Sequence, residues 1–588
     1  MNNNKSFYFM LVLAVIFTVY WLFFAPKNDQ QNSTINTEVT TDSSFTTPNN
    51  SSQQNIVTNV QNQFSSLTES NDYSQQLLTY QNDNLRVLFS DKGAFIKDVY
   101  INDRFLGRDG NTEHHILEGT EEDGGLILKM GAWNTGYTLK QILNNNDYFK
   151  LERAGNQFIF INNFINNNTQ SVYTIKKIYT FYENDFVFKL DLEITNSLNE
   201  EMKFDNSNSS FSIGWGPTLG IVGEKHDKRQ KNLLSYYNGK KIIDIAHKNR
   251  RLFPNNSRFN DSVSVDAGGW VVSNGHYFAS AIIPDSQRYR YFFDYREMEN
   301  NRYFTGLTRD VSRSSVNSSF RIYIGPKVSS VLRPYNNNRQ MGDINLIGSG
   351  INKLERMILF GIGNVIGKGL SFIYSIVKNY GIAIIILTIL IKLLLSPLTH
   401  SSMVSQKKMM AIQPKIKEIQ LKFKDNPQKI QEETMKCYSQ NKINPLGGCL
   451  PLFLQMPLLI AMYELLVNMV ELKGSSFLWI HDLSTPDKIL DIPISIFGLS
   501  GIPIHILPIF MVLTQFLTSF LTPASGANNN QTKIMMAMLP LVFFFMFYNV
   551  SSALVLYWTV MNILNLIQQV FVNRTELLKK LQFIRGVK

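Results

Sequence analysis

The sequence contains only two cysteines, Cys437 and Cys449, among its 588 residues. It has no Cys-x-x-Cys pair and no cluster of cysteine and histidine at the spacing of zinc ligands. Cys437 falls in a segment with a helical pattern, and Cys449 stands at the start of an apolar run, so their context does not support pairing. The sequence therefore predicts neither a bound metal nor a disulfide framework.

Signatures of catalysis are also missing. There is no His-Glu-x-x-His motif of a zinc protease and no Gly-x-Ser-x-Gly turn of a serine hydrolase. The segment Gly363-Asn-Val-Ile-Gly367-Lys368-Gly369 is close to a phosphate-binding loop. It has three residues between its glycines instead of four, and Gly where Ser or Thr must bind magnesium. We therefore expect a protein that is not an enzyme and that uses no cofactor.

Basic residues outnumber acidic ones, and the formal net charge is +11. Such a balance can point to nucleic acid, but its location in this chain points to a membrane. Residues 399–445 carry nine lysines against four acidic residues, and residues 573–588 carry five basic residues against one acidic residue. Both stretches adjoin apolar runs, as basic loops do on the cytoplasmic side of a membrane. We expect no sequence-specific binding of nucleic acid.

Six apolar segments are candidates for membrane spans. The first, residues 1–26, is long for a cleaved signal peptide and lacks an Ala-x-Ala site, so we interpret it as an uncleaved signal anchor. The others are residues 376–398, 446–472, 497–522, 533–549 and 551–572. Six spans place both termini on one side, and the lysines of 399–445 predict that this side is the cytoplasm. The loop 473–496 then lies outside.

The region between the first two spans is polar. Residues 27–76 are rich in Asn, Gln, Ser and Thr, which predicts a flexible tether. Residues 77–335 contain runs that alternate apolar and polar side chains, such as Phe188-Lys-Leu-Asp-Leu-Glu-Ile194. This pattern predicts a large antiparallel β-sandwich on the outer side of the membrane. Residues 351–375 are amphipathic and interrupted by glycine, which favours a helix lying at the membrane surface.

Residues 399–445 have the pattern of a helical hairpin. Apolar residues at helical spacing precede the turn Asp425-Asn426-Pro427, and a second apolar stripe follows it. One interpretation is simply that two short helices pack together. The other is that the hairpin is also a mobile cationic platform that meets substrate or the ribosome. Residues 573–588 are predicted to form a short basic cytoplasmic tail.

Lys392 lies inside the second predicted span. A charged side chain at the centre of a membrane helix costs about 2.5 to 3.5 kcal/mol on insertion scales, so such residues usually face a bundle interior or a hydrated cavity. Because Pro397 is close by, the lysine stem could instead reach the interface. Thr388, four residues earlier, shares the helical face of Lys392. Polar residues of the spans gather toward the predicted cytoplasmic half, which indicates a hydrated cavity that opens inward.

Several motifs together resemble those of one family, the YidC membrane-protein insertases of the Gram-negative type with a large periplasmic domain. The third predicted span has the family's signature, the outer loop and the last span look like theirs, and two further motifs are similar to its periplasmic domain. These motifs are Asn444-Pro-Leu-Gly-Gly-Cys449-Leu-Pro451 with Gln455-Met456-Pro457, Phe477-Leu-Trp-Ile-His-Asp-Leu483, Leu554-Val-Leu-Tyr-Trp558, Gly268-Gly-Trp270 with His276-Tyr-Phe278, and Tyr323-Ile-Gly-Pro-Lys327. The resemblance covers nearly the whole chain apart from the tether.

The resemblance implies a fold and a site. The fold is a polytopic α-helical membrane protein, with five of the six spans forming an insertase core, plus the periplasmic β-sandwich. The core encloses a hydrophilic groove that is open to cytoplasm and lipid, with a basic residue, usually Arg, in its first span. Lys392 occupies that position and keeps the charge, but it lacks the guanidinium fork. The other implied groove residues are Thr388, Gln455, Met456, Leu459 and Trp558.

The resemblance also implies a function, the insertion and folding of nascent inner-membrane proteins, alone or with the Sec translocon. Expected partners are nascent membrane proteins, the ribosome, the Sec translocon and the lipid bilayer, and the protein is expected to be a monomer or a weak dimer. One alternative is a secondary transporter or channel in which Lys392 binds an anionic solute, but we find no paired inverted repeats. Another is a scaffold whose β domain does the binding, which leaves Lys392 unexplained.

Overall fold

The structure is a computed structural model of the chain, and its description is limited to part of the sequence. The described residues are 63–70, 73–106, 112–216, 219–222, 233–237, 242–244, 263–265, 269–284, 289–296, 302–311, 315–336, 340–341, 344–345, 362–424, 426–441, 450–492, 502–521 and 540–584. The expected signal anchor, 1–26, and most of the expected tether lie outside them. The chain divides into two compact units, Asp42–Arg356 and Met1–Thr41 with Met357–Lys588.

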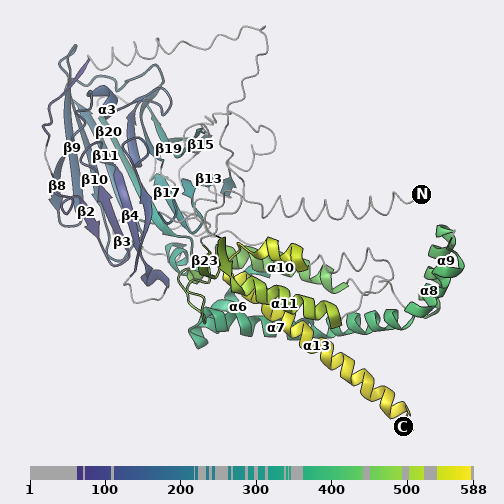
Figure 1. Ribbon diagram of the computed structural model, residues 1–588. Helices are drawn as coiled ribbons and strands as arrows, with labels where there is room; N and C mark the ends of the chain where they lie inside the picture. The colour runs from purple at the N-terminus through teal and green to yellow at the C-terminus, as the bar shows by residue number, and fades with distance from the viewer. Residues whose placement is uncertain are drawn as a thin grey trace. The chain divides into compact units, whose positions relative to one another are not determined.

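The first unit contains two antiparallel sheets, each with ten strands among the described residues (Figure 1). The first sheet has the order β1 (Phe64–Ser66), β9 (Gln157–Asn166), β10 (Val172–Thr180), β11 (Val187–Asn196), β20 (Ser315–Pro326), β17 (Phe278–Pro284), β16 (Trp270–Asn274), β13 (Leu233–Tyr237), β14 (Ile242–Asp244), with β8 (Lys150–Ala154) beside β9. The large antiparallel β domain predicted from alternation is confirmed.

The second sheet completes this unit. Its order is β15 (Val263–Val265), β18 (Tyr289–Arg296), β19 (Arg302–Asp310), β12 (Ser209–Trp215), β6 (Gly125–Met130), β4 (Ile96–Asn102), β3 (Leu85–Phe89), β2 (Thr79–Gln81), with β5 (Glu113–Glu118) beside β4 and β7 (Tyr137–Thr138) beside β6. The short elements are η1 (Asp103–Leu106), α3 (Leu139–Ile142), α5 (Ser329–Leu332), η3 (Arg333–Asn336) and the hairpin β21 (Gln340–Met341) and β22 (Ile344–Asn345).

The β domain begins earlier in the chain than residue 77. Strand β1 pairs with β9, with Phe64 opposite Asn166, and the Phe64 side chain is buried beside the rings of Phe164 and Tyr173. Residues 64–66 fall within the segment expected to be tether, so the described end of that segment is part of the sheet. A single buried aromatic residue anchors this short edge strand, although its surroundings in the sequence are polar.

Alternation explains the strands of the first sheet that have one face toward the core. In β9, β10 and β11 every second side chain is buried, as the period-two pattern requires. On β10 the inward positions are Tyr173, Ile175, Lys177 and Tyr179. By contrast, all residues of β12 and β17 are buried, so both faces of these strands are covered.

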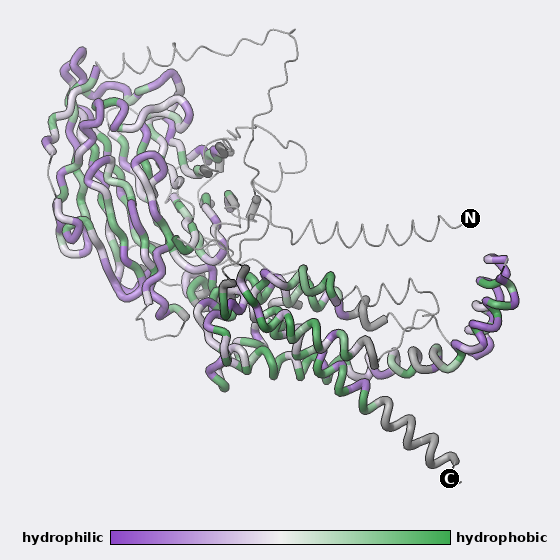
Figure 2. Tube along the Cα trace, viewed as in Figure 1, coloured by the Kyte–Doolittle hydropathy of each residue, from purple (hydrophilic) through white to green (hydrophobic). Residues whose placement is uncertain are grey.

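The second unit is helical and packs around one apolar core. Its helices are α6 (Ile362–Val377), α7 (Tyr380–Ala411), α8 (Gln413–Lys422), α9 (Pro427–Gln440), α10 (Leu450–Asn468), α11 (Ile506–Leu521) and α13 (Ser552–Ile584), with η7 (Val470–Leu472) and the hairpin β23 (Lys488–Ile492) and β24 (Ile502–His505) between α10 and α11. Buried residues of α6, α7, α10, α11 and α13 form the core. Figure 2 shows the coloured parts of α11 and α13, and the part of α7 beside them, as mainly hydrophobic.

Two helices among the described residues are long and apolar enough to cross a membrane, Tyr380–Ser405 and Ser552–Phe571. The apolar helices Val365–Val377 and Ile506–Thr518 are shorter. The described part of the expected span 497–522 begins at residue 502. Residues 502–505 pair as strand β24 with β23, and helix α11 begins at Ile506. The six-span arrangement therefore stays a prediction.

Helix α7 continues past the expected end of its span. It runs as one helix through Pro397 to Ala411. Proline cannot donate the usual backbone hydrogen bond, but the next turn is supported by the Thr399 hydroxyl, which donates to the carbonyl oxygens of Leu395 and Ser396, both at 3.1 Å. Beyond α7, helices α8 and α9 pack together through a small cluster of Met409, Ile412, Ile416 and Cys437.

Candidate functional site

The buried lysine of α7 is bound to a side chain of α13. Only 6% of the Lys392 surface is exposed. Its Nζ atom donates a hydrogen bond to Oδ1 of Asn565, at 2.5 Å. A charged donor makes a strong contact with a neutral acceptor, which offsets part of the cost of taking the ammonium out of water. The contact directs the ammonium toward α13, whereas in the snorkelling alternative the ammonium would reach the membrane interface.

Asn565 belongs to a row of residues on one face of α13. Trp558, Asn562, Asn565 and Gln569 follow one another at spacings of four, three and four residues, which places them on a single helical face. The side chains of Trp558, Asn562 and Gln569 are buried. Polar residues on the lipid-facing side of a membrane helix are unfavourable. We therefore infer that this face makes contacts inside the helical bundle.

Three polar atoms of this row have no hydrogen-bond partner among the described residues. They are Nε1 of Trp558, Nδ2 of Asn562 and Oε1 of Gln569. Buried polar atoms in proteins are nearly always hydrogen-bonded to protein or to water. The row therefore marks a place where water or a polar ligand can complete the hydrogen bonds.

The facing side of α7 is polar as well. The hydroxyl of Thr388, which is fully buried, donates to the carbonyl oxygen of Ile384 at 2.6 Å. Farther along, Thr399 and Gln568 of α13 are in hydrogen-bond contact at 3.2 Å. We use the name polar seam for these residues of the two helices: Thr388, Lys392, Ser396, Thr399, Trp558, Asn562, Asn565, Gln568 and Gln569. The seam also shows that α7 and α13 run parallel, since position 392 meets 565 and position 399 meets 568.

The chain was compared with known proteins. The family model described as "YidC periplasmic domain" matches residues 77–373, and the one described as "60Kd inner membrane protein" matches residues 372–580. The membrane protein insertase YidC of Treponema denticola is 30% identical over 542 residues, which are 88% of this chain and 89% of the relative. The chain belongs to the YidC family.

Other YidC proteins agree with this assignment. The membrane protein insertase YidC of Chlorobium luteolum is 29% identical and covers 96% of this chain and 94% of its own length. A solved YidC structure, "Active YidC insertase crystal structure with the first transmembrane domain resolved", covers 86% of this chain and 93% of its own, at 16% identity and a TM-score of 0.36. Membership of the YidC family therefore rests on the sequence comparisons.

The structure brings some of the groove residues implied by the YidC resemblance together, and it places others apart. Thr388 and Lys392 lie in the polar seam with Trp558. The Trp558 ring packs against the rings of both Phe543 and Phe547, at centroid distances of 5.5 and 5.7 Å. Its indole is therefore part of the apolar core, and its edge carries the Nε1 atom, for which the described part of the chain offers no acceptor.

The remaining implied residues lie on α10. Met456 is exposed, Gln455 is half-buried, and Leu459 packs at the edge of the core. Their spacing of three and four residues places Met456 and Gln455 close to Leu459 on the helix surface. Of the signature that begins at Asn444, residues 444–449 lie outside the described residues, and its remainder lies on α10.

Sequence reasoning missed the partner of the lysine. Asn562 and Asn565 are recognisable as polar residues of a span, but they were not chosen as site residues. Their spacing with Trp558 and Gln569 is a signal that could have found them, because it defines one helical face. The pairing of Asn565 with Lys392 depends on how α7 and α13 are rotated against each other, and a single sequence does not contain this information.

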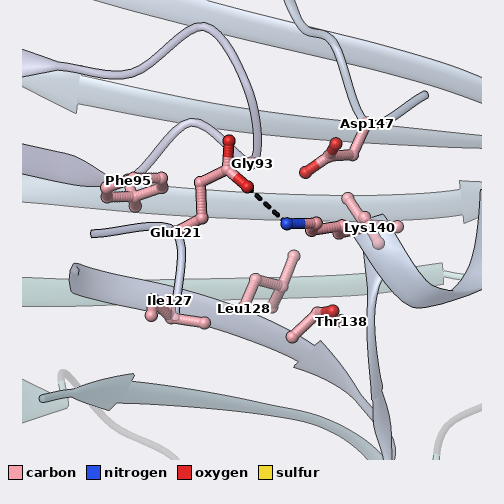
Figure 3. A pocket seen from close by; sticks show the side chains of 9 residues that line it. Gly93, Phe95, Glu121, Ile127, Leu128, Thr138, Lys140 and Asp147 are labelled. Atoms are coloured by element: carbon pink, nitrogen blue, oxygen red, sulfur yellow. Dashed lines mark hydrogen bonds and ion pairs between the residues drawn. The ribbon is translucent and has the colours of Figure 1, made fainter. Parts of the chain in front are cut away.

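The β domain has a small cavity of its own, drawn in Figure 3. An ion pair between Lys140 and Glu121, at 2.6 Å, crosses it, and apolar side chains such as Phe95 and Ile127 form its walls. Burial raises the pKa of Asp147, and one of its carboxylate oxygens has no partner among the described residues. Among those residues no group of three or more His, Cys, Asp or Glu side chains is arranged to hold a metal ion.

Proposed function

We propose that the protein is a membrane-protein insertase that guides the polar flank of a nascent span along the polar seam. The observation that carries this proposal is the buried Lys392–Asn565 contact beside three buried polar atoms that have no hydrogen-bond partner among the described residues. A hydrated surface of this kind inside a helical bundle offers a polar segment hydrogen bonds that hydrocarbon cannot offer. The curated relatives are insertases, and this leaves the transporter alternative without support.

The proposed topology has six spans with both termini in the cytoplasm. Helix α7 has 32 residues and α13 has 33, and at 1.5 Å per residue each is about 50 Å long, well beyond the roughly 30 Å of hydrocarbon. Their excess length lies at the same end, because the helices run parallel (Figure 1). Both excess segments are basic, with Lys407 and Lys408 on α7 and Arg574 and Lys579 on α13, which supports a cytoplasmic location for that end.

The proposed mechanism is physical. A nascent apolar segment slides along the lipid-facing mouth of the groove, where exposed Met456 offers an adaptable apolar contact. Its polar flank follows the seam, and an acidic flank is attracted by Lys392. Two opposite charges about 4 Å apart attract by roughly 4 kcal/mol near a protein surface, compared with roughly 1 kcal/mol in water. Release of the apolar segment into lipid then requires no nucleotide.

We propose that helices α8 and α9 receive the chain. Their lysines Lys415, Lys417, Lys422 and Lys429 are exposed, and the two helices form a unit through the Met409–Cys437 cluster. An exposed cationic surface at the cytoplasmic end of α7 suits a contact with ribosomal RNA phosphates or with the Sec machinery. The basic end of α13 lies at the same end of the bundle.

The test is insertion of a single-span client with an acidic translocated tail into liposomes that contain the purified full-length protein. Protease protection of the tail is measured for wild type, Lys392→Arg and Lys392→Met. Methionine keeps the length of the side chain and removes its charge. We expect wild type and Lys392→Arg to insert the client, and Lys392→Met to insert it about ten-fold less efficiently, which corresponds to about 1.4 kcal/mol.

Lys368→Met is the matched control, because Lys368 is an exposed lysine on α6. It loses the same charge outside the seam and is expected to insert like wild type. Equal insertion by all four proteins would remove Lys392 from the mechanism. Insertion no better than that of empty liposomes would contradict the insertase function itself under these conditions.

A further inference from the structure

The loop between α10 and α11 contains a tight turn with two large apolar side chains at its tip. Phe477 and Ile480 exchange both backbone hydrogen bonds, each at 2.9 Å, so Leu478 and Trp479 are the two central residues. Leu478 has a φ of +53° and is 74% exposed, and Trp479 is also exposed. A positive φ at the first central position is the geometry in which such a turn favours glycine.

Leucine at this position is unfavourable for the isolated fold. The left-handed conformation costs an L-residue with a Cβ atom roughly 1 to 2 kcal/mol, and exposing the Leu478 side chain to water adds no stabilisation. A residue held in a costly conformation by rigid surroundings is a reason to look for function. Burial of the Leu478 side chain in an apolar environment, such as lipid, would offset this cost.

The turn is held rigidly at one end of the bundle. Inside it, the Phe477 ring lies directly on Gly381 of α7, where even a Cβ atom would come within 2.1 Å of the ring. Ile480 and Leu483 are buried, and the Leu483 carbonyl accepts a hydrogen bond from Ala553 N at the start of α13. The tip of the turn therefore has a fixed position relative to α7 and α13.

Trp479 is fixed by its polar edge. Its Nε1 atom donates to the buried carboxylate of Asp487 at 3.2 Å, and the same carboxylate oxygen accepts from Leu507 N in the first turn of α11 at 2.6 Å. The indole ring faces Phe510 at a centroid distance of 6.3 Å. Trp479 thus has one hydrogen-bonded edge and an exposed apolar face, the arrangement typical of tryptophan at a membrane interface.

The exposed apolar surface is continuous with the outside of a helix. Phe510 is exposed on α11 together with Ile509, Leu513 and Leu517. In the proposed topology lipid covers this face of α11, and Trp479 adjoins it at Phe510. Ile489 and Leu490 of β23 are exposed as well, and Figure 1 shows β23 at the end of the bundle opposite α8 and α9.

We propose that the Leu478–Trp479 turn is an interfacial wedge that inserts into the outer leaflet of the bilayer and sets the depth of the helical bundle. This inference rests on the proposed topology, in which the loop lies outside. Lipid is the occupant because the apolar tip continues a lipid-facing helix surface and carries no charged side chain. Lys473 and Asp482, which flank the turn, bind each other at 3.3 Å instead.

The test uses the full chain in liposomes, with Cys437 and Cys449 replaced by Ser and the environment-sensitive dye NBD attached at Leu478→Cys. The same dye at Leu513→Cys on α11 reports a lipid-facing position. Leu198→Cys, at an exposed leucine in a turn of the β domain, is the water-exposed control. Quenching by lipids that carry a nitroxide near the headgroup is measured, and so is bleaching by externally added dithionite, which does not cross membranes.

The expected result is lipid quenching at 478 comparable to that at 513 and absent at 198, with dithionite reaching 478 and 198 from the same side. Bleaching from that side without lipid quenching would overturn the wedge and leave the topology intact. A shielded dye at 478 without lipid quenching would also overturn it, because protein would then cover the tip. Access to 478 only from the opposite side would overturn both the wedge and the proposed topology.

Discussion

A buried lysine in the β domain should make the stability of that domain depend on pH. Lys177 of β10 is fully buried, and its Nζ atom donates to the carbonyl oxygens of Ala94 at 2.6 Å, Leu126 at 3.0 Å and Gly93 at 3.3 Å. These contacts join the first sheet to β6 and to the β3–β4 turn of the second sheet. Ala94 and Leu126 have positive φ angles, so Lys177 also holds two unfavourable backbone conformations in place.

Burial lowers the pKa of Lys177 from 10.5 to about 7. Between these values the unfolded chain binds a proton that the folded domain does not bind, so the free energy of unfolding rises with pH. Below about pH 7 both states are protonated and the dependence ends. At 1.36 kcal/mol per pH unit, the whole window is worth roughly 5 kcal/mol. This is a ceiling, because three carbonyl contacts favour the ammonium and oppose the effect of burial.

The assay is urea unfolding of the full-length protein in detergent, followed by fluorescence of the β-domain tryptophans. From about pH 7.5 to about pH 9.5, wild type should gain up to roughly 2.5 kcal/mol. Lys177→Met should lose this gain, and it should be less stable than wild type at the higher pH because the Leu126 carbonyl loses its lysine contact. The matched control is Lys176→Met, since Lys176 lies on the opposite face of β10. If Lys177→Met keeps the wild-type pH dependence, the reasoning about Lys177 is refuted.

Two further variants test local packing and capping. Gly381→Ala brings a Cβ atom into the Phe477 ring and should destabilise the helical unit by about 1 to 3 kcal/mol in thermal unfolding, whereas Gly369→Ala meets only ordinary contact and should not. Asn426→Ala removes the side chain that caps α9 and should cost about 1 kcal/mol. Hydrogen exchange in the first turn of α9 should then accelerate, with Gln428→Ala as the unaffected control. Unchanged exchange in Asn426→Ala would show that the cap is dispensable.

The sequence was informative wherever one face of an element is buried. Period-two alternation predicted the β domain, because strands such as β9, β10 and β11 have one face toward the core. Alternation does not show that β12 and β17 are buried on both faces, since the small polar residues of β12 alternate with apolar ones and are buried too. It also does not anticipate that Lys177 occupies an inward position, because the carbonyl oxygens that accept its hydrogen bonds come from distant segments.

The site was predictable in part. A lysine inside an apolar run is visible in the sequence, and the family resemblance implies its role. Its partner Asn565 lies 173 residues away, and the choice among the polar residues of α13 depends on helix rotation. The exposed tip at Leu478 was not predictable either, because the sequence pattern shows neither its positive φ nor the packing of the neighbouring Phe477 on Gly381 of α7.

The central claim is that the charge of Lys392 attracts the polar flank of the inserting chain. The most direct measurement is a double-mutant cycle in the liposome insertion assay, with Lys392 or Met at position 392 and with acidic or amide residues in the client tail. We expect wild type to favour the acidic tail over the amide tail more strongly than Lys392→Met does, because only wild type offers the ammonium to the carboxylates. The same preference in both proteins would contradict the claim, because the polar seam would then act without the charge of its lysine.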